Sequence, residues 1–452
     1  MTDPIHAAGK GGGPTPFVNA FSNPTIGSLR YNTSQAGSPV FIAYGTCRVS
    51  VNLIEGWGFK GSGGGGKGGK GLGSSAGKKG SNQTYSTNIA FGLCQGPGSF
   101  TGAPLGFSGN NRVWANGGIA GFNTVGLNGY AGSDGQAPDP IFASADPDTP
   151  VIGYSGTCYV TGTPMQLGST PALPNISFEI GGFETGTAGP SFPGDARPDQ
   201  IVIDLLTNAR YGAGFPAAHL DSAGSLADWG NYCQAAQLAM SLLLDRQQPC
   251  ARWVEEIVQL TVAAVVWSGS LLKIIPYGDG ALGANGATWY PNLTWQYSLG
   301  DSDFLDFGAS GQTGSDPVQL TRSDPAYATN WLSIEYMNAG NGYNPQIIPV
   351  FDQGLIDRYG LRTEPSVQAH EITNPTSATV AAQLMLQRKA YVRNTYKFKL
   401  GWRYSLLEPM DIVLLSDPTL GLSGAPVRIT EIAEDDNGEL TVTAEEIPGV
   451  TP

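Results

Sequence analysis

The sequence has 452 residues, of which 13% are charged, 40% are hydrophobic and 64 are glycine. Because about 25% of the residues in an average globular protein are charged, long solvated faces are scarce here, and a solvated helical protein is excluded. Length and glycine content together predict a turn-rich β protein of roughly two to four domains that packs much of its surface against neighbours.

The net charge of −13 is unevenly distributed along the chain. Up to Ser133 there are nine basic and two acidic residues, whereas the remainder has fifteen basic and thirty-five acidic residues. Five of the ten lysines lie in one glycine-rich tract, namely Lys60, Lys67, Lys70, Lys78 and Lys79. Such a tract is either a solvated flexible loop or a segment that contacts an acidic surface, a phosphate backbone or a lipid head group.

The first 198 residues predict an N-terminal arm at 1–27 and a β domain at 28–198. The arm is rich in Gly, Pro and Asn, which favours order only against a partner. Within the domain, the Gly/Lys-rich tract forms a loop insertion at 60–84, between strand-like runs at 38–45, 46–54 and 85–97. Later signals are an Asn-Gly hairpin turn at 116–117 and strand-like runs at 157–161 and 174–180.

Residues 199–285 predict a small α/β domain. Pro198 begins a helical run, and Ser225 is placed to cap a second helix with Asp228 three residues later. A third helical run covers 251–261, and a strand hairpin is expected to turn at Ser268-Gly269.

Residues 286–452 predict a second β domain that ends in a β-barrel. A linking helix near 375–393 begins with Asn374 as its cap and Pro375 at its first position. After it, alternation predicts a strand whose apolar face is Tyr396, Phe398, Leu400 and Trp402, and an Asn-Gly turn at 437–438 predicts the last hairpin.

Catalytic signatures are missing from the sequence, so no catalytic residue, cofactor or metal ligand is expected. The three histidines, His6, His219 and His370, are isolated, and the tract 61–68 lacks the Ser or Thr of a phosphate-binding loop. Asp301, Asp303 and Asp306 suit a solvated turn better than a calcium loop or a pair of glycosidase carboxylates.

Cysteine spacing and hydropathy bear on the compartment. The five cysteines (47, 94, 158, 233 and 250) are widely spaced, which predicts buried, reduced thiols and folding in a reducing cytoplasm. Neither a signal peptide nor a run of eighteen apolar residues is present, so we expect no export signal and no transmembrane helix.

Several motifs, in order, resemble those of phage tail-tip hub proteins, the baseplate hub or tip attachment family of siphophages and gene transfer agents. The first are Gly-Ser-Pro-Val-Phe-Ile-Ala-Tyr-Gly-Thr-Cys-Arg-Val (37–49), Ile-Ala-Phe-Gly-Leu-Cys-Gln-Gly-Pro (89–97) and Arg-Val-Trp-Ala-Asn-Gly (112–117). Asp-Leu-Leu-Thr-Asn-Ala-Arg-Tyr-Gly-Ala-Gly-Phe-Pro (204–216) follows, and the helix capped by Asn374 resembles a tail-protein segment. The resemblance spans nearly the whole chain.

The resemblance implies a mainly β (α+β) structural protein rather than an enzyme. Two tail-tube-like β-barrel or sandwich domains would flank the α/β unit, and a homotrimer would form a pseudo-sixfold ring that closes the tail tube. Its partners would be the distal tail protein ring, the C-terminus of the tape-measure protein and fibre or spike proteins, with DNA only as passing cargo and the host envelope as a transient contact. The protein would be located at the virion tail tip after assembly in the bacterial host cytoplasm.

Two other function classes remain as alternatives. A receptor-binding tail adhesin would bind host cells as an isolated chain, and a tail-associated cell-wall hydrolase would cleave peptidoglycan. For the hub, the acidic remainder of the chain suggests a lumen that repels DNA. The Gly/Lys tract is expected to order against a neighbour, because each ordered residue costs about 1–2 kcal/mol of backbone entropy. Deletion of 61–80 should therefore leave folding intact.

Overall fold

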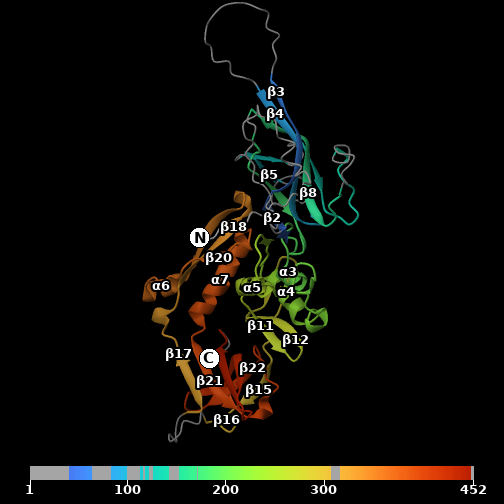
Figure 1. The fold of residues 1–452 in the computed structure, drawn as a ribbon. Helices are drawn as coiled ribbons and strands as arrows, with labels where there is room; N and C mark the ends of the chain where they lie inside the picture. The colour runs from blue at the N-terminus through green and yellow to red at the C-terminus, as the bar shows by residue number, and fades with distance from the viewer. Residues whose placement is uncertain are drawn as a thin grey trace, which may run out of the picture. The chain divides into compact units, whose positions relative to one another are not determined.

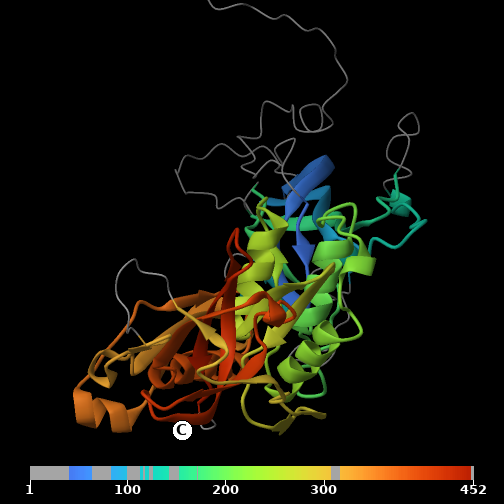
Figure 2. The ribbon, with the colours of Figure 1, turned by 90° about the horizontal axis from the view of Figure 1, so that it is seen from below.

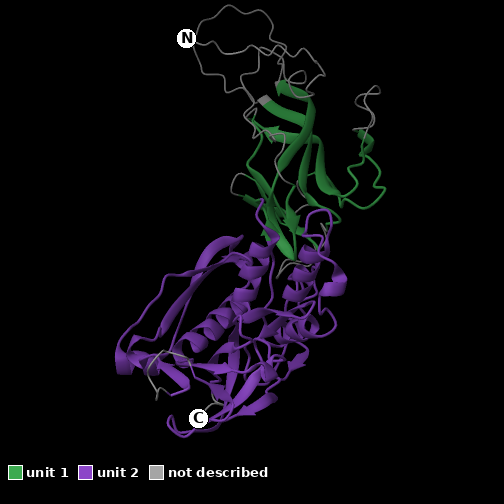
Figure 3. Cartoon of the chain, turned by 60° about the horizontal axis from the view of Figure 1, so that its bottom comes forward, with its two compact units in different colours: residues 1–183, 243–246 green, residues 184–242, 247–452 purple. Residues whose placement is uncertain are grey.

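A computed structural model describes eight stretches of the chain, namely residues 40–63, 83–98, 112–115, 118–121, 126–141, 152–169, 172–306 and 316–448. The fold is mainly β, as predicted. Contacts divide the chain into two compact units (Figure 3), one of residues 1–183 with 243–246 and one of residues 184–242 with 247–452. This grouping does not test the three predicted domains, which stay a prediction.

The first unit contains two four-stranded antiparallel sheets. One has the order β2 (Thr46–Ser50), β9 (Ile176–Gly181), β5 (Arg112–Ala115) and β6 (Gly118–Gly121). The other has the order β3 (Asn52–Gly63), β4 (Gln83–Gln95), β8 (Thr157–Gly168) and β7 (Leu127–Tyr130). A short pair joins β1 (Ile42–Ala43) to β10 (Leu243–Leu244).

Both sheets of the first unit contribute to one apolar core, so this unit is a β-sandwich. Phe178 comes from the first sheet and Phe91 from the second, and both are fully buried. Burying such a ring contributes about 1.5–3 kcal/mol. The predicted strand 46–54 is wrong in one respect. It is two strands, β2 and β3, because the chain passes from one sheet to the other at Val51.

The second unit begins with three helices and two short hairpins. The helices are α3 (Pro198–Thr207), α4 (Ser225–Ala235) and α5 (Cys250–Leu260). The hairpins pair β11 (Ala263–Ser268) with β12 (Leu271–Pro276), and β13 (Leu282–Ala284) with β14 (Ala287–Trp289). The predicted hairpin is confirmed, but its turn is Gly269-Ser270, one residue later than expected, because Ser268 still pairs with Leu271. Gly269 has a positive φ of 59°.

The capping box predicted at Ser225 is wrong. The N-cap residue of α4 is Gly224, which has no side chain to accept a hydrogen bond from the helix N-terminus. Instead, Asp221 Oδ2 accepts a hydrogen bond from the Ser225 backbone N–H at 2.8 Å. Asp228, the expected partner, accepts from Trp289 Nε1 at 3.0 Å. Asp221 thus satisfies the N–H of Ser225, the first of the backbone N–H groups that have no partner within the helix.

A long helix, α7 (Pro375–Tyr391), lies against a three-stranded sheet (Figure 1). The sheet has the order β19 (Asn344–Phe351), β18 (Trp331–Asn338) and β20 (Val367–Ala369), with α6 (Gln353–Tyr359) after β19. The predicted cap is confirmed, since Asn374 Oδ1 accepts from Ser377 N at 2.8 Å and Pro375 is at the first position.

Asp195 fixes the start of α7. Its buried carboxylate accepts hydrogen bonds from Ser241 Oγ at 2.5 Å, Thr373 Oγ1 at 3.0 Å and Asn374 Nδ2 at 3.0 Å. Burial raises the pKa of the Asp195 carboxyl above its usual value, and the three donors oppose that effect. One carboxylate therefore joins three segments that are far apart in sequence.

The C-terminal strands form a seven-stranded sheet around a second apolar core. They are drawn in red beside the yellow and orange strands in Figures 1 and 2. The order is β15 (Trp295–Leu299), β22 (Ile412–Asp417), β23 (Leu422–Glu434), β24 (Leu440–Glu446), β21 (Asn394–Leu400) and β16 (Phe304–Leu305), with β17 (Val318–Arg322) also on β21.

Local predictions for this sheet are mostly confirmed. Tyr396, Phe398 and Leu400 are buried on one face of β21, and the last hairpin turns at Gly438 with a φ of 74°. Trp402 is the exception, because β21 ends at Leu400 and Trp402 lies in a 3-10 turn with 59% of its surface exposed.

Candidate functional site

The Gly/Lys-rich tract connects the tips of a long antiparallel hairpin made of β3 and β4. Their ladder runs from Asn52 opposite Gly92 to Gly63 opposite Gln83. In Figure 1 the two strands project together beyond the rest of their sheet. The predicted insertion therefore lies at a hairpin tip, and its flanks at 60–63 and 83–84 belong to the strands.

Lys60 is the one predicted site lysine inside the described residues. It lies on β3 opposite Ser86, and it is exposed. Lys67, Lys70, Lys78 and Lys79 lie outside the described residues. The clustering of the five lysines therefore stays a prediction. So does the inference that 61–68 is not a phosphate-binding loop, because most of these residues lie outside the described part of the chain.

A bulge sets the direction of the distal hairpin. Trp57 is opposite Asn88 and Lys60 is opposite Ser86, so β3 has one extra residue between these pairs. Gly58 lies in the bulge with a φ of 64°, a left-handed conformation that favours glycine. Beyond it, the rings of Phe59 and Tyr85 stack at 5.7 Å. The hairpin thus has its own side-chain support.

An acid near the base of this sheet is a structural acceptor. Asp139 Oδ2 accepts from Tyr130 Oη and Thr161 Oγ1, both at 2.7 Å, and Oδ1 accepts from Ile141 N at 2.8 Å. The ring of Tyr159 stacks on Tyr130 at 4.5 Å, and burial raises the pKa of Tyr159 to about 12. Both oxygens of Asp139 therefore accept hydrogen bonds from the protein itself, which makes Asp139 a structural residue. A carboxylate in this arrangement is poorly placed to exchange a proton with a substrate.

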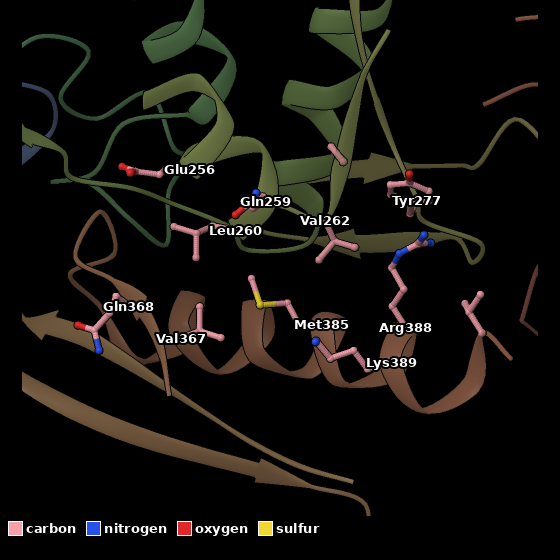
Figure 4. Close-up of a pocket in the computed structure, with 12 residues that line it drawn as sticks. Glu256, Gln259, Leu260, Val262, Tyr277, Val367, Gln368, Met385, Arg388 and Lys389 are labelled. Carbon is pink, nitrogen blue, oxygen red and sulfur yellow. The ribbon is translucent and has the colours of Figure 1, made fainter. Parts of the chain in front are cut away.

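The second unit contains a groove of about 530 Å³ between α5 and α7. In Figure 4, Leu260 and Val262 face Met385 across the groove, with Val367 nearby. Its ends are polar and include Glu256. One carboxylate oxygen of Glu256, Oε2, is buried without a hydrogen-bond partner. The groove thus has an apolar centre between polar ends.

Arg388 and Tyr277 line one end of this groove, and Arg428 contacts Tyr277 behind them. Arg388 on α7 donates to Glu445 through both terminal nitrogens, at 2.8 and 2.7 Å. Its guanidinium lies 3.5 Å from the centre of the Tyr277 ring. Arg428 donates to the Tyr277 carbonyl at 3.2 Å and to Asp279 at 2.7 Å. We call these five residues the arginine clasp. It links α7 to β23 and β24.

The three-stranded sheet leaves an apolar face exposed, and within the described residues no strand pairs with the outer edge of β19. Ile347 and Phe351 on β19 are 55% and 54% exposed. The Asp352 N–H donates toward the β18 side, to Asn330 O at 2.9 Å. Alternate residues of a strand point their N–H groups to opposite edges, so the N–H positions of residues 345, 347, 349 and 351 face the free edge. Pro345 and Pro349 have no N–H, which leaves two donors along that edge.

Several other residues singled out in the sequence make local contacts, whereas Asp301 and Asp306 are exposed. Asp303 is ion-paired to Arg403 and accepts from Tyr404 Oη at 2.7 Å. His219 Nδ1–H donates to Ser270 O at 2.9 Å, and His370 Nε2 lies 3.0 Å from Glu335. His6 lies outside the described residues. Sequence reasoning missed the groove and the clasp, for which no local pattern exists.

The described part of the chain gives two further negative findings. Within it, no group of three or more His, Cys, Asp or Glu side chains is arranged to hold a metal ion. Across the same residues, no helix is long and apolar enough to cross a membrane.

Comparisons with known proteins point to phage tails. Residues 250–432 match the family described as "Putative phage tail protein". A chain of the "Virion of native gene transfer agent (GTA) particle" is 16% identical, with a TM-score of 0.58 over 95% of this chain and 90% of that chain. Residues 250–432 thus resemble a phage tail protein family, and the chain shares its fold with a component of a gene transfer agent particle. No curated protein matches the sequence.

Two prophage proteins align over much of the chain with TM-scores too low to support an argument. Prophage tail protein gp18 from Listeria monocytogenes EGD-e is 10% identical, with a TM-score of 0.31 over 81% of this chain and 86% of that chain. The 43 kDa tail protein of prophage MuSo2 from Shewanella oneidensis is 14% identical, with a TM-score of 0.32 over 76% of this chain and 99% of that chain.

Proposed function

We propose that this chain is a non-enzymatic structural protein of a phage or gene transfer agent tail and that it forms the tail-tip hub. The observation that carries the proposal is the fold shared with a chain of a gene transfer agent particle over 95% of this chain. The match of residues 250–432 to a phage tail protein family supports it.

In this proposal three copies form a ring that closes the tail tube. Each copy contributes two β domains, at 28–198 and 286–452, on either side of the α/β domain at 199–285. The ring docks the distal tail protein and the end of the tape-measure protein, anchors fibres or a spike, and lets DNA pass. Exposed apolar side chains on the second unit, such as Phe351 and Leu406, support contacts with other chains.

The mass of the purified assembly tests this proposal. We expect native mass spectrometry to show three copies when the chain is produced together with its neighbouring distal tail protein. A chain that stays monomeric beside that partner would contradict the hub. Incubation with peptidoglycan and with host cells tests the alternatives, since a hydrolase would release muropeptides and an adhesin would bind the cells as a free chain.

The hairpin tip has its own test. Because Gly63 and Gln83 are opposite each other, an Asn-Gly turn in place of residues 64–82 closes the ladder without the tract. We expect this variant to fold and form trimers but to fail at tip closure or infection. A matched variant keeps the tract and changes its four lysines to glutamine, which separates the role of charge from that of length. Loss of folding in either variant would contradict a role for the tract in assembly.

A further inference from the structure

Two cysteines of the first unit face each other across one sheet. Cys94 is the penultimate residue of β4 and Cys158 is the second residue of β8, and the ladder places them directly opposite each other. Both side chains are fully buried, and their thiols are in hydrogen-bond contact. The other three cysteines lie on β2, α4 and α5, and none of them faces a cysteine in a described ladder.

The spacing of this pair suits a disulfide. Directly opposite residues of an antiparallel pair have Cα atoms about 4.5–5.5 Å apart, with both side chains on the same face. A disulfide needs Cα atoms about 4.4–6.8 Å apart. The Cα spacing therefore fits a disulfide, and rotation of the two thiols with a small shift of the strand ends is enough to join them. Gly98 leaves room for this rotation, since a Cβ there would lie 3.1 Å from Cys158 Sγ.

We propose that Cys94 and Cys158 are a modification site, at which a small disulfide oxidant such as glutathione disulfide converts the two thiols into one intrachain disulfide. One thiol loses its proton, and its thiolate attacks the oxidant and releases one glutathione. The second thiolate then attacks the mixed disulfide, forms the Cys94–Cys158 bond and releases the second glutathione. The two electrons and two protons lost by the cysteines end on the two glutathione molecules.

The same geometry slows the oxidation of the pair. The hydrogen bond from Cys94, followed by burial, holds the pKa of the Cys158 thiol well above its usual value, so little thiolate is present. Access requires local opening. The last ladder pair, Gln95 opposite Thr157, lies one residue beyond the cysteines, and strand ends open at a lower free-energy cost than strand centres. Oxidation is therefore slow and confined to one end of the ladder.

A disulfide at this position would fix β4 to β8. Because β4 is also one strand of the projecting hairpin, the bond would anchor that hairpin at its base. The expected consequence is a higher urea midpoint for the first unit in the oxidised protein than in the reduced protein.

Thiol counting on the full chain tests the proposal. The protein carries C250S, because Cys250 is partly exposed and would form its own mixed disulfide. It is held in buffers of rising glutathione disulfide to glutathione ratio, then denatured, alkylated and analysed by mass spectrometry. We expect the number of free thiols to fall from four to two, with a cross-linked peptide that joins residues 94 and 158. C47S in the same background should still lose two thiols, whereas C94A and C158A should lose none.

Three results would overturn the proposal. In the first, all four thiols remain free at the highest ratio of glutathione disulfide to glutathione, although an alkylating reagent reacts with Cys94 and Cys158 of the folded protein on the same timescale. The second is four free thiols because no reagent reaches the pair at all, since an unreachable pair is not a modification site. The third is a disulfide that involves Cys47 or Cys233. Circular dichroism of each variant shows whether it is folded. If C94A does not fold, C94S is used in its place.

Discussion

The arginine clasp allows a stability prediction with a defined size. The perturbation is R388M, which keeps an unbranched side chain of similar length beside Met385 while removing the guanidinium. Glu445 would then keep a carboxylate whose side chain is 9% exposed, without the two hydrogen bonds that Arg388 donates. Removing one partner of a buried ion pair costs about 3–5 kcal/mol.

Two corrections set the expected value. The Arg388 side chain is 29% exposed, so solvent screening brings the loss to the lower end of that range, about 3 kcal/mol. Loss of the guanidinium contact with Tyr277 adds about 1 kcal/mol. The double variant R388M/E445Q removes both charges, and we expect it to recover most of the loss, because replacing a whole buried pair is often neutral.

Hydrogen exchange followed by mass spectrometry measures this prediction segment by segment. A chain with two compact units does not unfold in one step, so a single unfolding midpoint would mix their responses. The two losses together come to about 4 kcal/mol, so we expect amide protection in α7 and β24 to fall on the order of 1,000-fold in R388M, since each 1.4 kcal/mol is a factor of ten. Protection in the first unit should not change. The reasoning is refuted if R388M costs no more than the double variant.

Three further predictions concern single positions. G58A should destabilise the distal hairpin by about 1–2 kcal/mol, because Gly58 has a φ of 64° and the added Cβ would lie 3.2 Å from Asn88 Nδ2. Gly269 has a similar φ of 59° but nothing within 4 Å of an added Cβ. Hydrogen exchange in G58A and G269A therefore separates backbone strain from crowding of the added methyl group. N374A should lower the local stability of α7 by about 1–3 kcal/mol in hydrogen exchange, because it removes the cap of α7 and a donor to Asp195, and unchanged amide protection in α7 would contradict both roles. Burial raises the folded-state pKa of Asp195, so its proton-linked stabilisation is fully present below the unfolded pKa of about 3.9 and is lost as the pH rises through the folded pKa. The stability of the wild type relative to D195N should therefore fall as the pH rises from 4, and a difference that does not vary with pH would refute this sign.

Features encoded within a few neighbouring residues were predictable from the sequence. Asn374-Pro375 begins a helix as expected, because the side-chain oxygen and the fixed φ of proline act within one turn. The turns at Gly269 and Gly438 follow from residues that tolerate positive φ. The predicted Ser225 cap was wrong for a local reason too, since the carboxylate of Asp221, four residues upstream, accepts the hydrogen bond from the Ser225 N–H.

Features that depend on long-range register were not predictable. The groove brings together α5, β20 and α7, and α5 is more than a hundred residues away from the other two in sequence. Likewise, Cys94 and Cys158 each fit the alternation of a strand, but the pattern of one strand does not say which residue of another strand lies opposite it. The same limit hid the change of sheet at Val51, because alternation continues through it.

The prolines of β19 lead to a last prediction about assembly. A strand edge with all its N–H groups free can pair with another copy without limit, and edge prolines prevent this. We expect P345A/P349A, which restores two outward N–H donors, to form higher-order aggregates in sedimentation velocity. The control I347A removes apolar surface from the same strand and changes no N–H group. If the proline variant associates no more than the control, the edge is protected by something other than missing donors.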